Sequence, residues 1–304
     1  MSRFVLSQLL QSLVTLFVIS IVVFFLGRAT GDPAMLLLPS DATPEQFEQV
    51  RRDLGLDKPI YTQYVSWAEK VVRGDFGNSI RTRDPVSKII MERLPNSLTL
   101  ALVALSFVIL VGIPLGIIAG INRGGPIDTI SQMVAFAGMS VPVFWSGIVL
   151  MQIFSVWLGW LPTSQMGGPQ HYVMPAFSLG LFVAAGTMRL TRSSMLDVLN
   201  TEYTKLARIK GLSEVRVILI HALRNALIPV VSFAGVYFAL LVSMAVVTET
   251  VFSWPGIGRL AYEAVLWRDF PLIQGVILAI SVITMACNLF AEILYAYIDP
   301  RIRY

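Results

Sequence analysis

The sequence predicts an all-α integral membrane protein with six membrane-spanning helices. Hydrophobic residues make up 55% of its 304 residues and charged residues 14%, and the mean hydropathy is +0.71. A soluble domain would carry about 25% charged residues. Six stretches are apolar over roughly the 20 residues that a helix needs to cross a bilayer. In addition, many basic residues gather in one connection between two of these stretches, which sets the orientation.

The chain is expected to form one domain, residues 1–304, with spans at 5–27, 96–121, 129–160, 172–188, 226–248 and 272–298. The first is interpreted as an uncleaved helix, because its apolar stretch exceeds the roughly 7–15 residues of a signal-peptide core and no clean small-x-small cleavage site follows it. The third is long enough for a span with an extra turn or two, and Pro142 is expected to bend it.

The orientation follows from the charges of the short connections. The connection 189–225 contains Arg189, Arg192, Lys205, Arg208, Lys210, Arg216 and Arg224. The loop "TSQMGGPQH" before the fourth span contains no Lys or Arg. Because cytoplasmic loops carry the excess of basic residues, the connection 189–225 is expected in the cytoplasm, together with both termini. The long loop 28–95 then lies outside, in the periplasm.

The periplasmic loop 28–95 contains signals for short amphipathic helices. Thr43 and Gln46 have the spacing of a capping box at the start of the first helix. A second helix is expected within 59–74 and a third within 84–95. They are too short to span a bilayer, so we expect them to lie on the outer membrane face. They would form a gate, a docking surface for a partner, or a structural cover.

Two stripes of small residues recur at four-residue spacing within the spans. They are Gly112, Gly116 and Gly120 in the second span, and Gly235, Ala239 and Ser243 in the fifth. Small residues let the backbones of neighbouring helices approach closely. The stripes predict helix packing, and a sliding interface is the alternative.

Ionisable and nucleophilic groups are scarce inside the spans. Glu292 lies in an apolar run and is interpreted as an interfacial or interhelical carboxylate, while Glu249 sits at the outer end of the fifth span. Cys287 is the single cysteine, which excludes a disulfide framework, and His221 has no second metal ligand nearby. The chain also lacks the GxxxxGK[ST] phosphate loop. These observations disfavour an ion-coupled carrier, a membrane enzyme and a P-loop nucleotide site.

The most distinctive segment is the basic island 202–225, "EYTKLARIKGLSEVRVILIHALRN". Asn200 or Thr201 is expected to cap a short helix that begins at Glu202, and Gly211 is expected to end it. The acidic residue in the first turn and the basic residues in the last turn suit the helix dipole. The island therefore predicts a helix outside the membrane rather than a further span.

The apolar residues of the island predict a face that needs a partner. Leu206 and Ile209 form a small apolar face beside Ala207. Ser213 is expected to cap a second piece, with an apolar side made of Val215, Ile218, Leu219 and Ala222. From the pattern alone, the island is either a solvated basic face against anionic lipid or a lever that docks on another protein.

Seven segments resemble one known family, and they occur in order along the whole chain. They are "GDPA" (31–34), "LGLDKPIYTQY" (54–64), "GDFGNS" (74–79), "LGWLPTS" (158–164), "EYTKLARIKGLSEVRVILIHALRNALIPV" (202–230), "ETVFSWPGIGRL" (249–260) and "DPRIR" (299–303). The sequence resembles the permease subunits of bacterial ATP-binding-cassette importers of the dipeptide, oligopeptide and nickel class. The long loop 28–95 is typical of the first of the two permease types, and the resemblance implies the type I importer permease fold.

The resemblance implies that 189–225 is the cytoplasmic coupling loop, of which 202–222 docks in a groove of the ATPase subunit. The residues implied in ATPase coupling are Glu202, Lys205, Leu206, Ala207, Arg208, Ile209, Lys210, Gly211 and Leu212. The wider superfamily writes this loop as Glu-Ala-Ala, three residues, Gly, and here only Ala207 and Gly211 match. Gly211 would allow the change of direction, and Ala207 would keep the docking face shallow.

The resemblance further implies an importer without enzymatic activity of its own, in the bacterial inner membrane and in contact with its lipid. This chain would form half of a pathway for peptides, as a heterodimer with a sister permease. ATP and Mg would bind to two partner ATPase subunits and no cofactor to this chain. A periplasmic or lipid-anchored binding protein would deliver the substrate, and no nucleic acid is involved. Nickel chelates, glutathione, opines and oligosaccharides are alternative substrates, and an ion-coupled secondary transporter is the alternative mechanism.

Overall fold

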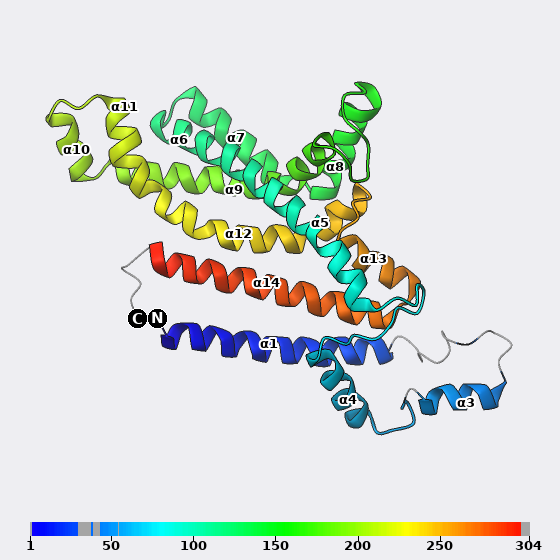
Figure 1. Ribbon diagram of the computed structural model, residues 1–304. Helices are drawn as coiled ribbons and strands as arrows, with labels where there is room; N and C mark the ends of the chain where they lie inside the picture. Colours follow the sequence, from blue (N-terminus) through cyan, green and yellow to red (C-terminus); the bar gives the residue numbers. More distant parts are fainter. Residues whose placement is uncertain (1, 30–37, 39–42, 54, 299–304) are drawn as a thin grey trace.

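The computed structural model describes residues 2–29, 38, 43–53 and 55–298. Within this part of the chain the regular elements are helices, joined by turns and by one isolated bridge between Asn78 and Pro85. Long helices lie side by side in a layered bundle, and shorter helices cover its two ends (Figure 1). The expected all-α fold is therefore confirmed.

Six crossings are present among the described residues, and one of them is broken. Five helical stretches are long and apolar enough to cross a bilayer. They are α1 (Ser2–Ala29), the continuous run of α5 (Val86–Phe107), η1 (Val108–Gly112) and α6 (Ile113–Ile121), α9 (Gln170–Leu199), the run of α11 (Glu214–Arg216), η3 (Val217–Ala222) and α12 (Leu223–Val251), and α14 (Phe270–Ile298). The sixth is a bent pair, α7 (Pro126–Ser140) with α8 (Val143–Leu150) and η2 (Met151–Trp157).

The two ends of the bundle differ in what they carry. The start of α1, the end of α14 and the short helix α10 (Glu202–Ile209) lie at one end (Figure 1). Helices α3 (Pro44–Asp53), α4 (Ile60–Val72) and α13 (Ile257–Trp267) lie toward the other end. Six crossings with both termini on the cytoplasmic side require this arrangement.

Helix α9 is the centre of the bundle and α1 lies at its edge. Helix α9 packs against α5, α6, α7, α8 and α12, and Leu179, Val183 and Met188 are among its buried apolar residues. The largest core cluster joins it to α5 and α12 through residues such as Leu100, Leu179 and Leu241. By contrast, α1 packs on α14 and exposes a broad apolar surface, as expected of a helix that faces lipid.

The third span is two helices and not the single bent helix that we expected. At Pro142 the chain turns by 104° between α7 and α8. Inside a bilayer, polar contacts with a neighbouring helix can hold such a break. The hydroxyl of Ser178 on α9 donates to the Val143 carbonyl at 2.8 Å and lies 2.9 Å from the hydroxyl of Ser146. Contact with α9 therefore stabilises the break.

The expectation of a separate third helix within 84–95 was wrong, because this segment is the first part of α5. Pro95 lies inside the helix and does not end it. Val86 and Ile90 are buried in a cluster with residues of α13 and α14. Tertiary packing therefore stabilises a helix that continues past Pro95, although a proline usually marks a helix boundary in a sequence.

The first two outer helices form as expected. The Thr43 amide donates to Gln46 Oε1 at 2.9 Å and the Gln46 amide donates to Thr43 Oγ1 at 3.3 Å, which confirms the capping box. The sequence spacing of Phe47, Val50 and Leu54 predicts an apolar stripe on α3, and Leu54 lies outside the described residues. Helix α4 lies against the outer half of α1, where Tyr64 and Trp67 contact the ring of Phe24.

The glycine stripe of the second span lies against α9. A Cβ atom at Gly116 would stand 2.6 Å from the Met188 carbonyl oxygen and 2.5 Å from Thr191 Cβ. Gly112 and Gly120 meet the same helix one turn to either side. Because a carbonyl of a packed helix cannot move aside, only glycine permits this spacing between α6 and α9.

The small residues of the fifth span lie against α14. The Cβ of Ala291 fills the space in which a Cβ at Gly235 would stand. The Ser243 hydroxyl lies 3.3 Å from the Thr284 hydroxyl. Ala239, which stands between Gly235 and Ser243 in the stripe, is buried. The two stripes thus set the distances from α6 to α9 and from α12 to α14.

We predict that Gly116→Ala lowers the free energy of unfolding by about 1–3 kcal/mol, the usual cost of overpacking. Gly138→Ala is the matched control, because a Cβ there also faces α9 but at an ordinary contact distance of 3.4 Å or more. Thermal unfolding of the purified chain in detergent measures both. Equal unfolding temperatures for the two variants would contradict the close contact at Gly116.

Candidate functional site

Helix α10 is fixed by its inner face to the ends of the neighbouring helices. The Thr204 side chain is fully buried, and its hydroxyl lies 2.7–3.1 Å from the carbonyl oxygens of Thr201, Val198 and Leu199. The Tyr203 hydroxyl accepts a hydrogen bond of 2.8 Å from Asn225 Nδ2 on α12. Helix α10 is therefore connected both to α9 and to α12.

The outer face of α10 is apolar and exposed. Leu206 is 54% exposed and Ile209 is 80% exposed. Arg208 pairs with Glu214 at 2.7 Å, and this contact joins α10 to α11 across Gly211. Gly211 has φ +78°, a left-handed conformation that glycine adopts without strain. The sequence-based expectation of a helix that ends at Gly211 is confirmed.

Several details of the island differ from expectation. Ala207 is buried against the chain itself, so its side chain is not part of the exposed face. Thr201 occupies the N-cap position, but its hydroxyl lies 2.6 Å from the Val198 carbonyl oxygen and makes no capping bond. Ser213 likewise makes no side-chain cap. The helical period of the sequence could not show which face of α10 the end of α9 would cover.

The second piece of the island is not a separate helix. Helix α11 continues through η3 into α12, so it is the inner end of the fifth span. The π-helical turn in η3 shifts the register of the side chains. Of the expected apolar side, Ala222 is buried, whereas Val215 and Leu219 are exposed, and Val217 is buried instead.

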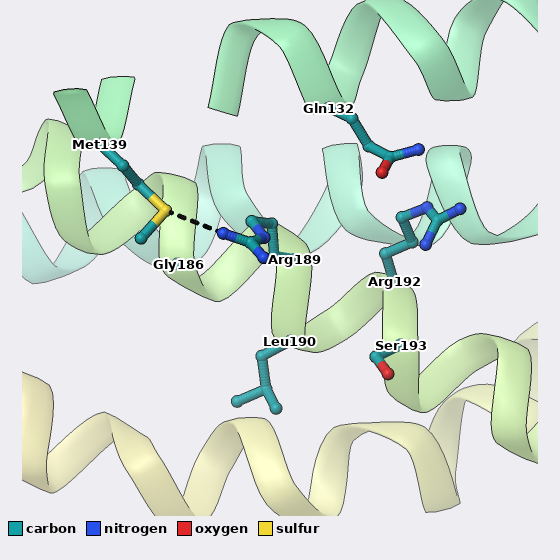
Figure 2. A pocket seen from close by; sticks show the side chains of 7 residues that line it. All are labelled: Gln132, Met139, Gly186, Arg189, Leu190, Arg192 and Ser193. Atoms are coloured by element: carbon teal, nitrogen blue, oxygen red, sulfur yellow. Dashed lines mark hydrogen bonds between the residues drawn. The ribbon is translucent and has the colours of Figure 1, made fainter. Parts of the chain in front are cut away.

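A buried ion pair that sequence reasoning missed ties the α6–α7 connection to α9. Asp128 is 2% exposed, and both its oxygens accept from the Arg192 guanidinium at 2.6 and 2.8 Å. The Gly124 amide and Gln132 Nε2 donate to the same carboxylate at 2.9 Å. Figure 2 shows Arg192 and Gln132 facing each other from α9 and α7. Asp128 and Arg192 are 64 positions apart, so no local pattern connects them.

At the outer end of the bundle, Glu249 holds α13. The carboxylate is fully buried, and its Oε2 accepts from the Gly258 and Arg259 amides at 2.8 and 3.0 Å. These amides belong to the first turn of α13, where a negative charge is favoured. Any Cβ at Gly256 would collide with this carboxylate. The segment 249–260 is therefore a capping motif, and α13 was not predicted because its cap lies on another helix.

The same outer segment is joined to α5. Trp254 is fully buried and its Nε1 donates to the Asn96 carbonyl at 3.1 Å, while Asn96 Nδ2 donates to the Pro255 carbonyl at 2.8 Å. The Ile257 amide donates to Ser97 Oγ at 2.8 Å. These contacts fix the outer ends of the second and fifth spans to each other.

The outer loop is joined to the start of α14 in a similar way. Asp269 is fully buried and accepts from the Ser79 hydroxyl and from the Arg81 and Leu272 amides. The Arg81 guanidinium lies 4.0 Å from the centre of the Trp267 ring. The segment 75–85 therefore packs on the start of α14.

Within the described residues, no group of three or more His, Cys, Asp or Glu residues could hold a metal ion. His221 lies in η3, and Cys287 is a partly buried free thiol on α14. Glu292 is partly buried on α14, and its Oε2 has no hydrogen-bond partner in the described part of the chain. The arrangement therefore contains a rigid inner helix and a fixed outer end, and among these residues we identify no catalytic constellation.

Two family models match the chain. The model described as "Binding-protein-dependent transport system inner membrane component" matches residues 112–304. The model described as "Binding-prot-dependent transport system membrane comp, N-term" matches residues 1–101.

Curated relatives match over the full length. The glutathione transport system permease proteins GsiC of Escherichia coli strain K12 and of Shigella dysenteriae serotype 1 are 43% identical to this chain over 305 residues. The alignment covers 100% of this chain and 100% of each relative.

Solved structures share the fold at low sequence identity. An inward-facing MetNI methionine ABC transporter has a TM-score of 0.59 and 15% identity, and the match covers 69% of this chain and 96% of that one. An amino acid ABC transporter has a TM-score of 0.54 and 13% identity over 69% of this chain and 94% of that one.

We predict that Asp128→Ala lowers the free energy of unfolding by about 3 kcal/mol, because it leaves the Arg192 charge without its buried partner. The double variant Asp128→Ala, Arg192→Met should recover part of this loss, since no charge is then left unpaired. Glu69→Ala, which breaks an exposed ion pair with Arg73, serves as the control and should change little. Thermal unfolding of the purified chain provides the comparison, and equal losses in the single and double variants would contradict the pairing.

Proposed function

Because the chain belongs to the family of binding-protein-dependent transport system inner membrane components, and is thus a permease of an ATP-driven importer, we propose that α10 is the element that receives work from the ATPase. A permease is not an enzyme, and ATP hydrolysis belongs to the partner ATPases. Force must therefore enter this chain through a contact with another subunit. The exposed apolar face of α10, at the cytoplasmic end of the bundle, is the surface that we assign to this contact.

The observation that carries this proposal is the pair of opposite faces of α10. Its outer face exposes Leu206 and Ile209, and its inner face is fixed by the Thr204 and Tyr203 hydrogen bonds to α9 and α12. A helix held on one side and apolar on the other transmits a displacement as a rigid body. A push on α10 would therefore move the inner ends of the two spans that pack most centrally.

The charged residues of the island would complement this face. Glu202, Lys205, Arg208 and Lys210 neighbour the two apolar residues along α10 and its C-terminal end, and Leu212 follows the turn at Gly211. Charges at the rim of an interface steer association and fix the register more than they add affinity. Ala207, which is buried, would act by permitting the close packing of α10 on the bundle.

Substrate-binding and ATPase partners follow from the family, and the finer composition belongs to our proposal. We propose a heterodimer with a sister permease, two ATPase subunits that bind ATP and Mg, and a periplasmic or lipid-anchored binding protein. This chain would bind no cofactor. The relatives named as glutathione permeases support a substrate in the range of small peptides, including glutathione.

The coupling proposal is tested by changing the exposed face of α10 alone. Leu206→Asp and Ile209→Asp are expected to reduce ATP-driven uptake at least tenfold, because a carboxylate in an apolar socket loses its solvation. Leu206→Met and Ile209→Met, which keep the apolar surface, are the matched controls and should retain most uptake.

Uptake and ATPase stimulation by the loaded binding protein are measured in proteoliposomes that contain the assembled importer. Copurification of the ATPase subunits reports the contact directly. Normal uptake and normal ATPase stimulation in both Asp variants would show that the work enters the permease elsewhere.

A further inference from the structure

A stripe of exposed and half-buried residues runs along one side of the central helix α9, and it is polar toward the inner end of the helix. Phe182, Gly186, Arg189, Ser193 and Asp197 follow one another at steps of three or four residues, and none of them is buried. Residues at this spacing lie on one face of a helix. Val173 and Phe177 at the outer end of α9 are exposed as well, and between Gly186 and Asp197 the stripe is the side of the helix that its neighbours in the described chain leave open.

Arg189 is the charged centre of this stripe. The described part of the chain contains no carboxylate oxygen within ion-pair distance of its guanidinium, and its hydrogen-bond contact there is the Met139 sulfur at 3.5 Å (Figure 2). Arg192, one turn away, is neutralised by Asp128. The two arginines therefore differ in kind, because Arg192 belongs to a structural ion pair and Arg189 is an uncompensated cation among the described residues.

A cavity of about 450 Å³ lies beside Arg189, between α7 and α9. Gln132 and Met139 of α7 line it, together with Gly186, Arg189 and Ser193 of α9 (Figure 2). Gly186 has no side chain, so it leaves open space on the stripe one turn before Arg189. The cavity combines a cation, a hydroxyl and an amide, which are the donors that an anionic oxygen needs.

The depth of Arg189 distinguishes it from an arginine at the membrane surface. Gly116 on α6 packs against Met188 and Thr191, so Arg189 lies at the level of Gly116. The chain remains apolar beyond this level as far as Ile121, where α6 ends. Five residues of helix correspond to about 7.5 Å. The guanidinium is therefore at a depth where the neighbouring helix is suited to hydrocarbon.

An unpaired guanidinium at this depth indicates water and not lipid next to the stripe. Charged side chains within a span face the bundle interior or a water-filled cavity, because exposure to hydrocarbon is costly. The exposed side of α7 offers a contrast in the same chain, since Ile130, Met133 and Phe136 are apolar there and 60–71% exposed. Helix α7 thus presents a lipid-compatible surface, whereas the inner half of α9, from Arg189 to Asp197, presents a polar one.

From this contrast we propose that the stripe of α9 lines the aqueous path of the substrate, and that Arg189 binds a carboxylate of the substrate as it passes. The proposal rests on the function proposed above, because a path exists only in an importer permease. It assigns to this chain a selectivity of its own, in favour of substrates with a free carboxylate. Ser193 and Gln132 would add neutral hydrogen bonds to the same anionic group.

The first experiment measures the electrostatic potential at the stripe with charged thiol reagents. Ser193→Cys is introduced into a Cys287→Ser background, which makes the new thiol the only one in the chain. In the assembled importer we expect the anionic reagent sulfonatoethyl methanethiosulfonate to react several times faster than the cationic trimethylammonium reagent, each relative to its rate with a free thiol. Arg189→Gln should remove this preference, and Arg189→Lys should restore it.

Two controls keep this measurement specific. Arg123→Gln removes an exposed arginine from the α6–α7 connection and should leave the reagent preference of the Ser193→Cys variant unchanged. Phe136→Cys, on the exposed side of α7 and in the same background, should react with neither water-soluble reagent.

Two results would overturn the proposal. One is a Ser193→Cys variant as unreactive as the Phe136→Cys variant, which would mean that lipid or the sister permease covers the stripe. The other is a preference for the anionic reagent that persists after Arg189→Gln, which would mean that the guanidinium does not set the potential there.

The second experiment measures selectivity during transport. The importer is given an equimolar mixture of di- and tripeptides with free carboxylates and of their C-terminal amides, and uptake is measured by mass spectrometry. For each importer, uptake of the peptides with free carboxylates is divided by uptake of their amides. The ratio for Arg189→Gln is then divided by the wild-type ratio, which removes the preference of the binding protein because both importers use the same one. We expect this quotient to be about one fifth or lower, because a charge-assisted hydrogen bond is lost.

A quotient near one would overturn the carboxylate site. If neither the wild-type importer nor the Arg189→Gln variant imports any peptide, the peptide class proposed above is wrong. The thiol experiment then still decides whether Arg189 lies at an aqueous anion site. Failure of the coupling proposal is separable as well, because the thiol reaction does not depend on ATP hydrolysis.

Discussion

Polar groups inside a bilayer must find partners within the protein, and the arrangement around α9 follows from this constraint. Where α7 breaks from α8, the Ser178 hydroxyl of α9 donates to the Val143 carbonyl in the first turn of α8. Where Asp128 is buried at the start of α7, Arg192 of α9 neutralises it through two hydrogen bonds. The glycines of α6 allow the backbones to approach closely enough for these contacts to form. Helix α9 thus holds the broken third span and the inner end of the second span in place.

The same constraint divides the chain into a fixed outer end and an inner end suited to receive a push. On the outside, buried carboxylates cap the helices that follow them: Glu249 holds α13 and Asp269 holds the start of α14. On the inside, α10 is attached to α9 and α12 on one face and exposes Leu206 and Ile209 on the other. A rigid inner helix on a bundle with a fixed outer end is the arrangement that our coupling proposal requires, since a displacement at the inner end must reach the spans attached to it.

Arg189 and Arg192 show how neighbouring residues of one type can have different roles. They lie three positions apart on α9, and a sequence count treats both as cytoplasmic positive charges. The structure separates them, because Asp128 neutralises Arg192 while Arg189 opens into the cavity between α7 and α9. In a permease that receives its substrate from a binding protein, a cationic site on the path would add a second step of substrate selection.

The sequence by itself determined the class of the protein, the number of crossings, the orientation and the position of α10, because hydropathy, basic loops and helix-stop glycines are local properties of the chain. The match of seven ordered segments also indicated the family. Tertiary structure alone decided that Pro142 separates two helices, that Pro95 lies inside one, that Ala207 faces inward, and that α13 exists. Each of these depends on a partner far away in the chain, such as Ser178 for the break at Pro142 and Glu249 for α13. Local patterns contain no information on which distant group will satisfy a freed backbone atom or cover a helix face, so these features required the folded chain.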